Sequence, residues 1–277
     1  MKAFAFSLSL MLAAAPAAAT EVTADTVGPL IQLMQPDIAV LGEVHDNPIH
    51  HLNQAAAIRA LKPKALVFEM LTPDQAAQIT PALRKDPKAL AQAIGWEEAG
   101  WPDFAIYAPI FQAAPDALII GAALPRDELR TIMAEPIERY LGVDAAGFGV
   151  DQPYPPELQK SLEDEAQRDH CNALPPEALP KIVEAQRLRD AVFTRTAMRA
   201  RKTTGGPVAV ITGTGHTRTD LAVPHMLRKA LPGLKILALG QVEQAEGEAL
   251  PDDLPYDFWI VTDPAPREDP CLVFQKG

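Results

Sequence analysis

Six short apolar runs, separated by segments with helical patterns, constrain the fold of this chain more than any other feature. The runs are Ile38–Leu41, Ala65–Glu69, Ala117–Leu124, Val208–Thr212, Lys235–Leu239 and Phe258–Thr262. Each has the length expected of a buried strand. Strands that alternate with helical segments form βαβ units, and these build a mainly parallel sheet flanked by helices. The sequence therefore predicts an α/β fold.

The segments between these runs indicate how the domain is organised. From Pro73 to Gly100 the pattern is helical but interrupted by Pro81 and Pro87, which predicts a helical insertion that covers one side of a site. The other expected segments are helices at Asn53–Leu61, Pro156–Cys171 and Glu177–Lys202, a Gly/Pro-rich loop at Gly142–Pro156, and an acidic loop at Gln241–Asp253. We find no linker that divides the chain and expect one domain over residues 20–277.

The first 19 residues have the pattern of an export signal. Lys2 supplies a positive charge, Ala3–Ala14 is apolar, and Ala17–Ala19 offers a cleavage site of the A-x-A type. The apolar run is short for a membrane span, and no cysteine follows it that could carry a lipid. We therefore expect residues 1–19 to be a signal peptide and the mature protein to be soluble, and periplasmic or secreted.

Export changes the interpretation of the two cysteines, Cys171 and Cys271. A pair of cysteines in an oxidising compartment predicts a disulfide. Closing a loop of this length would stabilise the fold by about 4–5 kcal/mol in the chain-entropy model. The alternative is two free thiols that lie too far apart to meet.

Charge and motif content exclude several classes of function. Acidic residues outnumber basic ones by 36 to 25, and the net charge of −11 argues against nucleic acid or an anionic membrane surface as the main partner. The sequence contains no P-loop, G-x-G-x-x-G, G-x-S-x-G or C-x-x-C motif. Nucleotide binding and the common serine or thiol chemistries therefore have no support.

Two of the predicted strands end in the same tetrapeptide, Gly-x-x-His, at Gly42–His45 and Gly213–His216. A glycine permits a tight turn after a buried strand, and the imidazole three residues later can reach over the edge of the sheet. In open α/β sheets, ligands bind at the carboxyl ends of the strands. Glu43, Glu69 and Arg126 come from corresponding strand ends, so we predict that these residues share one site.

This set of residues is compatible with two kinds of chemistry. The imidazoles of His45 and His216, together with Glu43 and Glu69, could hold Mn, Co or Zn with open positions for water. Metal-bound water of lowered pKa would then make the protein a hydrolase. Without a metal, the same groups could activate water as a general base while Arg126 holds an anion. For each residue, the alternative is an ordinary hydrogen-bonded side chain at a strand end.

Two more histidines lie at the start of the next predicted helix. Pro48 suits the first turn of that helix, with Asp46 or Asn47 as its N-cap. His50 and His51 are adjacent, so their side chains point about 100° apart on a helix. We expect one of them to face the site and the other to lie on the surface.

Aromatic residues gather around Trp96, Trp101, Phe104 and Tyr107. We interpret Trp96 and Phe104 as a small apolar cluster beneath a loop. Tyr107 is the member with a hydroxyl that it can offer to a ligand.

Taken together, these motifs resemble the ChaN-like haem-binding family, within the larger group that includes Tiki proteases and erythromycin esterases. The matching segments are Leu41–Pro48 with His51, Phe68–Met70, Tyr107–Ile110, Gln186 with Arg189–Ala191, and Gly213–Arg218 with Val223–Pro224. They follow in order from about Pro36 to Leu227, so the resemblance is specific at the level of the family.

The resemblance implies an exported protein of haem or iron uptake. Histidine or tyrosine side chains would bind the iron, and the candidates are His45, His51, Tyr107 and His216. The haem propionates would meet Arg126, Arg218 or the helix start near Pro48. The resemblance also allows an outer-membrane haem receptor as a partner, and a homodimer.

The resemblance equally implies that the paired Gly-x-x-His motifs correspond to the metal motifs of Tiki-type enzymes. A metal-dependent hydrolase is therefore the alternative function. A non-catalytic scaffold for a membrane receptor would bind neither metal nor haem.

Overall fold

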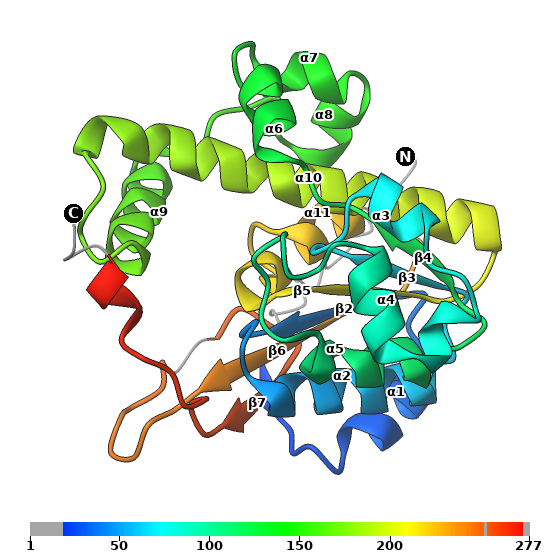
Figure 1. Ribbon diagram of the computed structural model, residues 1–277. Coiled ribbons are helices and arrows are strands. Elements are labelled where there is room, and N and C mark those ends of the chain that lie inside the picture. Colours follow the sequence, from blue (N-terminus) through cyan, green and yellow to red (C-terminus); the bar gives the residue numbers. More distant parts are fainter. Residues whose placement is uncertain (1–18, 252–253, 274–277) are drawn as a thin grey trace, which may run out of the picture.

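The computed structural model describes residues 19–251 and 254–273, and its centre is one sheet of seven parallel strands (Figure 1). The strand order is β1-β7-β6-β2-β5-β3-β4. The strands are β1 (Thr20–Glu21), β2 (Ile38–Glu43), β3 (Ala65–Phe68), β4 (Leu118–Gly121), β5 (Val208–Gly213), β6 (Ile236–Glu243) and β7 (Phe258–Thr262). All six predicted strands are present, and the parallel α/β fold is confirmed. All but the last residue of the predicted signal peptide lies outside the described residues.

Helices cover both faces of the sheet, which explains why its central strands are apolar without interruption. One face packs against α1 (Val27–Met34), α2 (Pro48–Leu61), α4 (Pro87–Ala93) and α5 (Phe104–Ala113). The other packs against α10 (Leu179–Thr204) and α11 (Val223–Ala230). Within β2, Ala39 and Leu41 point to the first face, and Ile38 and Val40 to the second. This alternation follows from the two-residue repeat of a strand.

The predicted helical insertion is present between β3 and β4, where it forms α3 (Pro73–Ala77), a 3₁₀ turn at Leu83–Lys85, and α4. Pro87 does not break a helix, because it occupies the first turn of α4 behind the N-cap Asp86. The aromatic cluster expected beneath a loop is instead part of the core. Phe104 begins α5. The ring of Trp96 packs edge-on against Phe104 and Tyr107, with ring centroids 5.2 and 4.8 Å away.

A small lobe of α6 (Arg126–Ile132), α7 (Ile137–Leu141) and α8 (Asp144–Phe148) stands on the outer side of α10 (Figure 1). The prediction of a loop at Gly142–Pro156 is wrong for its first half. Ala145 and Phe148 lie one helical turn apart in α8 and pack against α10. Gly142 and Gly149, both with positive φ, follow α7 and α8 and bring each helix to an end.

Helix α9 (Pro156–Asp169) projects beside α10 as an arm with no buried residue. The predicted disulfide is present and joins Cys171, after the end of this arm, to Cys271 near the C-terminus. Figure 1 shows the C-terminal segment running from β7 to the arm. The remaining short elements are 3₁₀ turns at Pro176–Ala178, Thr214–Thr217 and Pro270–Val273. Among the helices of the described residues, none is both long and apolar enough to cross a membrane.

Candidate functional site

The strand order brings the predicted site residues together. Strand β5 lies between β2 and β3, so the carboxyl ends of these three strands are neighbours. Glu43, the last residue of β2, pairs in register with Gly213, the last residue of β5. Glu69 follows β3, and its backbone N–H donates to the carbonyl of Ile211 in β5 at 3.0 Å. The two Gly-x-x-His motifs thus meet at one edge of the sheet, as predicted.

Carboxylates and imidazoles alternate in a series of five side chains at this edge, which we call the carboxylate–imidazole chain. Its members, in order, are Glu43, His45, Glu69, His216 and Asp190. At its two ends, His45 Nδ1 lies 2.8 Å from Glu43 Oε1, and His216 Nδ1 lies 2.7 Å from Asp190 Oδ1. In the middle, the Nε2 atoms of His45 and His216 lie 3.9 and 3.6 Å from Glu69 Oε1. Each imidazole is therefore anchored through Nδ1 and directs Nε2 toward a shared carboxylate.

The electrostatics of this chain favour charged imidazoles. Burial lowers the pKa of His45, but the hydrogen bond to Glu43 and the charge of Glu69 outweigh it and raise the pKa to about 9. Burial acts in the same direction on His216, where the charges of Glu69 and Asp190 raise the pKa above its usual range. The unliganded protein therefore favours protonated imidazoles, and a metal that binds a ring nitrogen must displace its proton.

The three carboxylates respond differently to the same surroundings. Burial raises the pKa of Glu43, but hydrogen bonding to His45 and the nearby His51 lower it to about 2. Burial also opposes ionisation of Glu69, whose pKa is nevertheless lowered by the charges of His216 and His45 and by hydrogen bonds. In Asp190 burial prevails, and the pKa of this carboxyl is raised. Asp190 is thus the one carboxyl of the three whose pKa is raised.

Tyr107 is a support of the site and not an exposed ligand. Its side chain is completely buried, and its hydroxyl donates a hydrogen bond of 2.8 Å to Glu43 Oε1. Burial raises the pKa of this hydroxyl far above the usual value. In this structure the hydroxyl is therefore engaged by Glu43 and does not face an open site. The residue instead fixes the carboxylate that anchors His45.

The expectation of one surface histidine at the start of α2 is also wrong, because His50 and His51 are both completely buried. Nδ1 of His50 accepts from the Val44 backbone N–H at 2.8 Å, and its Nε2 lies 2.8 Å from the Thr262 hydroxyl. His51 Nδ1 lies 3.4 Å from Glu43 Oε2, too far for a well-formed hydrogen bond, and neither atom has another partner among the described residues. His50 therefore holds the backbone of the first motif, while His51 faces the site.

The N-cap of α2 is Asn47, whose side chain accepts from the Ile49 N–H at 3.0 Å. Its amide also donates to Glu243 Oε1 at 2.7 Å, which ties this helix start to the end of β6. Of the two N-cap candidates, the structure selects Asn47.

The two motif glycines are needed for space and not for a turn. Neither Gly42 nor Gly213 has positive φ, so neither position requires a glycine for its backbone conformation. A Cβ on Gly42 would lie 2.9 Å from the hydroxyls of Thr214 and Thr217. A Cβ on Gly213 would lie 3.1 Å from His45 Nε2. Each glycine thus leaves room for a side chain of the neighbouring motif.

The two predicted arginines differ in availability. Arg126 is exposed at the first position of α6 and forms no ion pair with any described residue. Arg218 binds Glu165 Oε2 at 3.0 Å and Asp220 Oδ2 at 2.8 Å. Arg218 is therefore already neutralised by two carboxylates, which weakens its prediction as a propionate partner.

Two residues of the site have no role in the sequence-based prediction. Asp190, which is 1% exposed, anchors His216 from the buried side of α10. An acid between the packing residues Leu188 and Val192 was the available signal. Gln241 was assigned to an acidic loop, but it is a buried residue of β6 that donates to the carbonyl oxygens of Gly42 and His50 at 2.7 and 3.0 Å. No comparable signal marks Gln241.

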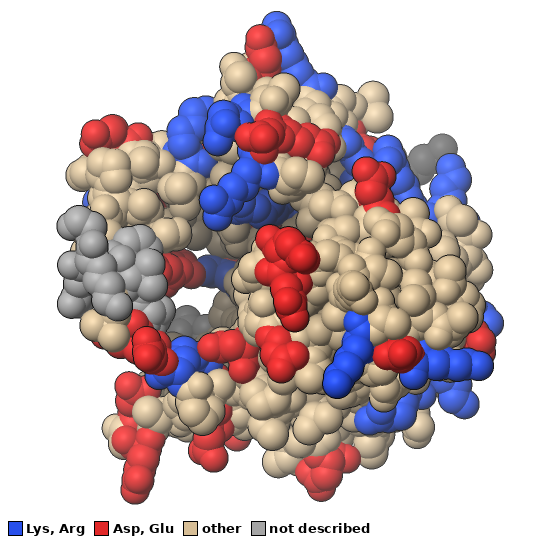
Figure 2. Space-filling view, in the orientation of Figure 1, with Lys and Arg blue, Asp and Glu red and all other residues tan. Residues whose placement is uncertain are grey.

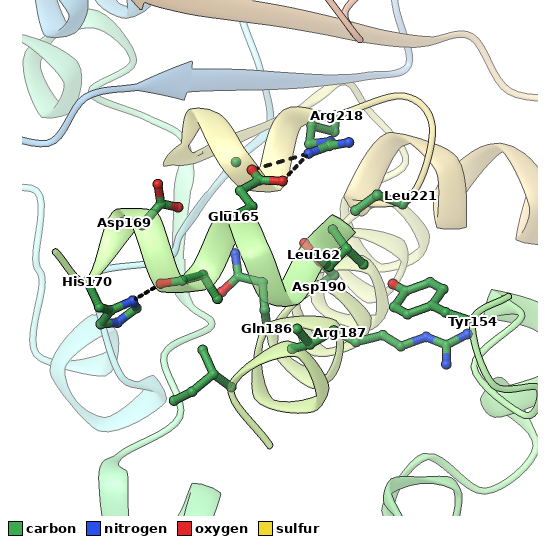
Figure 3. A pocket seen from close by; sticks show the side chains of 14 residues that line it. Tyr154, Leu162, Glu165, Asp169, His170, Gln186, Arg187, Asp190, Arg218 and Leu221 are labelled. Atoms are coloured by element: carbon green, nitrogen blue, oxygen red, sulfur yellow. Dashed lines mark hydrogen bonds and ion pairs between the residues drawn. The ribbon is translucent and has the colours of Figure 1, made fainter. Parts of the chain in front are cut away.

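Access from solvent differs between the two imidazoles. The side chain of His45 is 33% exposed, and its ring lies 4.9 Å from that of Trp101. The side chain of His216 is 7% exposed. A small cavity of about 190 Å³ lies beyond it, between α9 and α10, with Asp190, Tyr154 and Arg187 among its lining residues (Figure 3). The cavity reaches Asp190, but its volume is small for a haem.

A metal centre gains no support from this arrangement. Among the described residues, no three or more His, Cys, Asp and Glu side chains are grouped so that they could hold a metal ion. In place of a common ion, Glu43 and Asp190 are hydrogen bonded to the imidazoles. The predicted Mn, Co or Zn ion, and the hydrolase that depends on it, are therefore not supported.

Comparisons with known proteins show a family by sequence and a fold by structure. The sequence model of the family described as "Haem-binding uptake, Tiki superfamily, ChaN" matches residues 30–227. A structure of ChaN from Campylobacter jejuni with cofacial haem binding has 23% sequence identity and a TM-score of 0.59, and the match covers 84% of this chain and 89% of that one. The type III effector HopBA1 has 13% identity and a TM-score of 0.50 over 87% of this chain and 93% of its own. These two likenesses show a common fold. No curated protein matches the sequence.

Proposed function

The chain belongs to the ChaN family of haem-binding uptake proteins in the Tiki superfamily, and from this premise we propose that it binds haem at His45. The observation that carries the proposal is the geometry of this imidazole. Nδ1 is anchored by Glu43, and Nε2 belongs to a side chain that is 33% exposed. A haem ligand needs an oriented nitrogen that the iron can reach.

The surroundings of His45 fit this role. Metal-binding histidines commonly hold a carboxylate on the second ring nitrogen, which fixes the ring and raises its basicity, and Glu43 supplies such a group. Trp101, partly exposed beside His45, offers an aromatic surface to the macrocycle. His216 is less suitable, because its side chain is 7% exposed. Tyr107 and His51 are completely buried.

The propionates need a cation that is not already neutralised. Arg126 begins α6, which follows β4 at the same edge of the sheet, and it forms no ion pair with a described residue. Arg218 is paired with Glu165 and Asp220. We therefore assign a propionate to Arg126 and not to Arg218.

Titration of the purified protein with haemin tests the proposal. We expect a saturable shift of the Soret band, which His45→Ala abolishes or moves. His225→Ala is the matched control, because His225 is exposed and far along the chain in α11. Tyr107→Phe should keep the position of the band. A spectrum that is unchanged in His45→Ala but altered in Tyr107→Phe would overturn the assignment of the ligand.

We place this function outside the cytoplasm, in haem or iron uptake. The N-terminal signal pattern and the Cys171–Cys271 disulfide support an oxidising compartment. Fractionation of an expressing host tests the location, and the expected result is a processed protein in the periplasm or medium. An outer-membrane receptor and a haem-sharing homodimer belong to the same proposal. Sedimentation with and without haemin tests the homodimer, and co-purification of haem-loaded protein with outer-membrane proteins tests the receptor.

A further inference from the structure

A second hollow of the molecule lies far from the carboxylate–imidazole chain. It is a groove of about 670 Å³ between α8, the last turns of α10, and the segment that follows α11. Arg199 in this groove follows Asp190 by nine residues, or about 14 Å along the axis of α10. None of the five residues of the carboxylate–imidazole chain lines the groove. Any ligand of this groove is therefore independent of the proposed haem site.

The groove is basic, although the whole chain carries a net charge of −11. Four cations from one short stretch of α10 line it, namely Arg195, Arg199, Arg201 and Lys202, and Asp144 is the one carboxylate among its lining residues. Figure 2 shows basic side chains gathered along α10 beside the lobe of α6–α8. The local charge is thus opposite to that of the molecule.

Two of these cations are committed to the fold. Arg195 binds Asp144 at 2.7 Å, and Arg201 binds Asp37 at 3.0 Å. The pairing of Arg201 is incomplete, because its buried Nε has no hydrogen-bond partner among the described residues. Burying an N–H without a partner costs free energy, so this atom marks a place where an acceptor is missing.

The other two cations are free to meet a ligand. Arg199 and Lys202 are both exposed, and neither forms a hydrogen bond or an ion pair with any described residue through its side chain. They lie three positions apart on α10, so they project from the same side of the helix. Together they form a place for one anionic group.

Apolar side chains form the rest of the groove. Phe148, Met198, Leu231 and Leu234 line it together with Val143. Val143 is 95% exposed, the highest value among the exposed large hydrophobic residues. It stands at the tip between α7 and α8, where an apolar side chain contributes nothing to the core. An anion site bordered by an exposed apolar tip matches an amphiphile with an acidic head.

We propose that this groove binds the phosphate headgroup of an acidic phospholipid and so holds the molecule at an anionic membrane surface. The phosphate meets Arg199 and Lys202, while Val143 enters the acyl region. Clustered Lys and Arg next to apolar residues bind anionic bilayers in this way. The acidic residues elsewhere do not prevent this, because salt screens charges over about 10 Å at 0.1 M.

Sedimentation with vesicles tests the proposal. We expect the purified protein to bind phosphatidylglycerol-containing vesicles but not phosphatidylcholine vesicles, and to dissociate as the salt concentration rises. Arg199→Gln with Lys202→Gln should weaken the partition about thirtyfold, since each cation near a surface contributes roughly fivefold. Val143→Glu should weaken it as well, and this exposed substitution leaves the core intact.

The matched control is Lys85→Gln with Lys88→Gln, which removes the same charge from the opposite face of the sheet. It should leave vesicle binding unchanged. Equal weakening by the control pair, or equal binding to phosphatidylcholine vesicles, would overturn the proposal. So would saturation of the groove by inorganic phosphate alone, or loss of haemin binding in Arg199→Gln with Lys202→Gln while vesicle binding persists. Circular dichroism confirms that each variant is folded.

Discussion

The two Gly-x-x-His strand ends have the same sequence form but differ in their exposure. At the end of β2, His45 is anchored to Glu43, and a third of its side chain is exposed beside Trp101. At the end of β5, His216 is anchored to Asp190, and its side chain is 7% exposed. Both imidazoles direct Nε2 toward Glu69. The two imidazoles therefore have the same orientation but differ in how far neighbouring segments shield them from solvent.

Helix α10 supplies the covering of His216. Phe193 packs edge-on against the imidazole at 4.8 Å, and the Gln186 amide lies 3.2 Å from Nε2. The arm α9 lies outside this layer, fastened by Glu165–Arg218 and by the disulfide. No equivalent helix crosses His45 in the described part of the chain. The local motif thus sets the direction of an imidazole, whereas distant segments decide whether a ligand reaches it.

The largest expected effect is on the His216 side of the site, which α10 and the arm α9 cover. Replacing both Cys171 and Cys271 by Ser should lower the free energy of unfolding by about 4 kcal/mol, because the unfolded chain loses a 100-residue loop constraint. Hydrogen exchange should rise in α9 while β2 keeps its protection. Urea denaturation of the oxidised protein and the variant measures the first effect. An unchanged transition midpoint would show that the disulfide is not needed to hold the arm.

Glu69→Gln should affect both imidazoles, His45 and His216. Removing the shared charge lowers the pKa of His45 and of His216, since Glu69 raises both. We expect a loss of about 3 kcal/mol in stability, typical of hydrogen bonds and ion pairs to a buried charged group. NMR titration of the imidazole protons measures the two pKa values. Glu98→Gln, at an exposed position, should change neither, and a shift at only one imidazole would refute the shared role.

Acid should lower the stability of the protein on the His45 side of the site, because His50 is buried there. Burial lowers the pKa of His50 to about 4, below its ordinary value near 6.5. The unfolded chain therefore binds a proton more readily, so this contribution to stability is complete above pH 6.5 and is lost as the pH falls toward 4. Between about pH 7 and pH 5 the loss is about 2 kcal/mol. Denaturation at both pH values measures it, and His50→Gln should show less pH dependence than the native chain.

Gly213→Ala should have the smallest effect and act on His45 alone. The added Cβ would lie 3.1 Å from His45 Nε2, so the imidazole must shift. Overpacking of this kind costs about 1–2 kcal/mol, and we expect a weaker Soret shift with haemin. Gly215→Ala is the control, because its Cβ would have Gln186 Nε2 as its nearest atom at 3.9 Å. If both variants bind haemin as the native chain does, the close approach of Gly213 has no functional role.

The sheet and half of the site follow from sequence periodicity. The runs of β2, β3 and β5 are buried on both faces. Glu43, His45, Glu69 and His216 lie at or just after strand ends that the strand order makes adjacent. Asp190 was not predicted, because its role depends on how α10 rotates over β5. The burial of Tyr107 was not predicted either, because no local pattern showed that Phe104–Ala113 is a helix packed on the core. Contacts across long separations carry no local signature.

The position of β2 in the sheet has a consequence for synthesis of the chain. Its neighbours are β5 and β6, and Val208 follows Glu43 by 165 residues. The first strand, β1, pairs with β7, the last one. A chain that emerges from its N-terminus therefore carries an unpaired apolar strand until most of its length has been made. Non-local pairing of this kind is slow and leaves apolar surface open to aggregation. Nascent chains that end before β6 should therefore depend on chaperones, and the edge that holds His45 completes its assembly only near the end of translation.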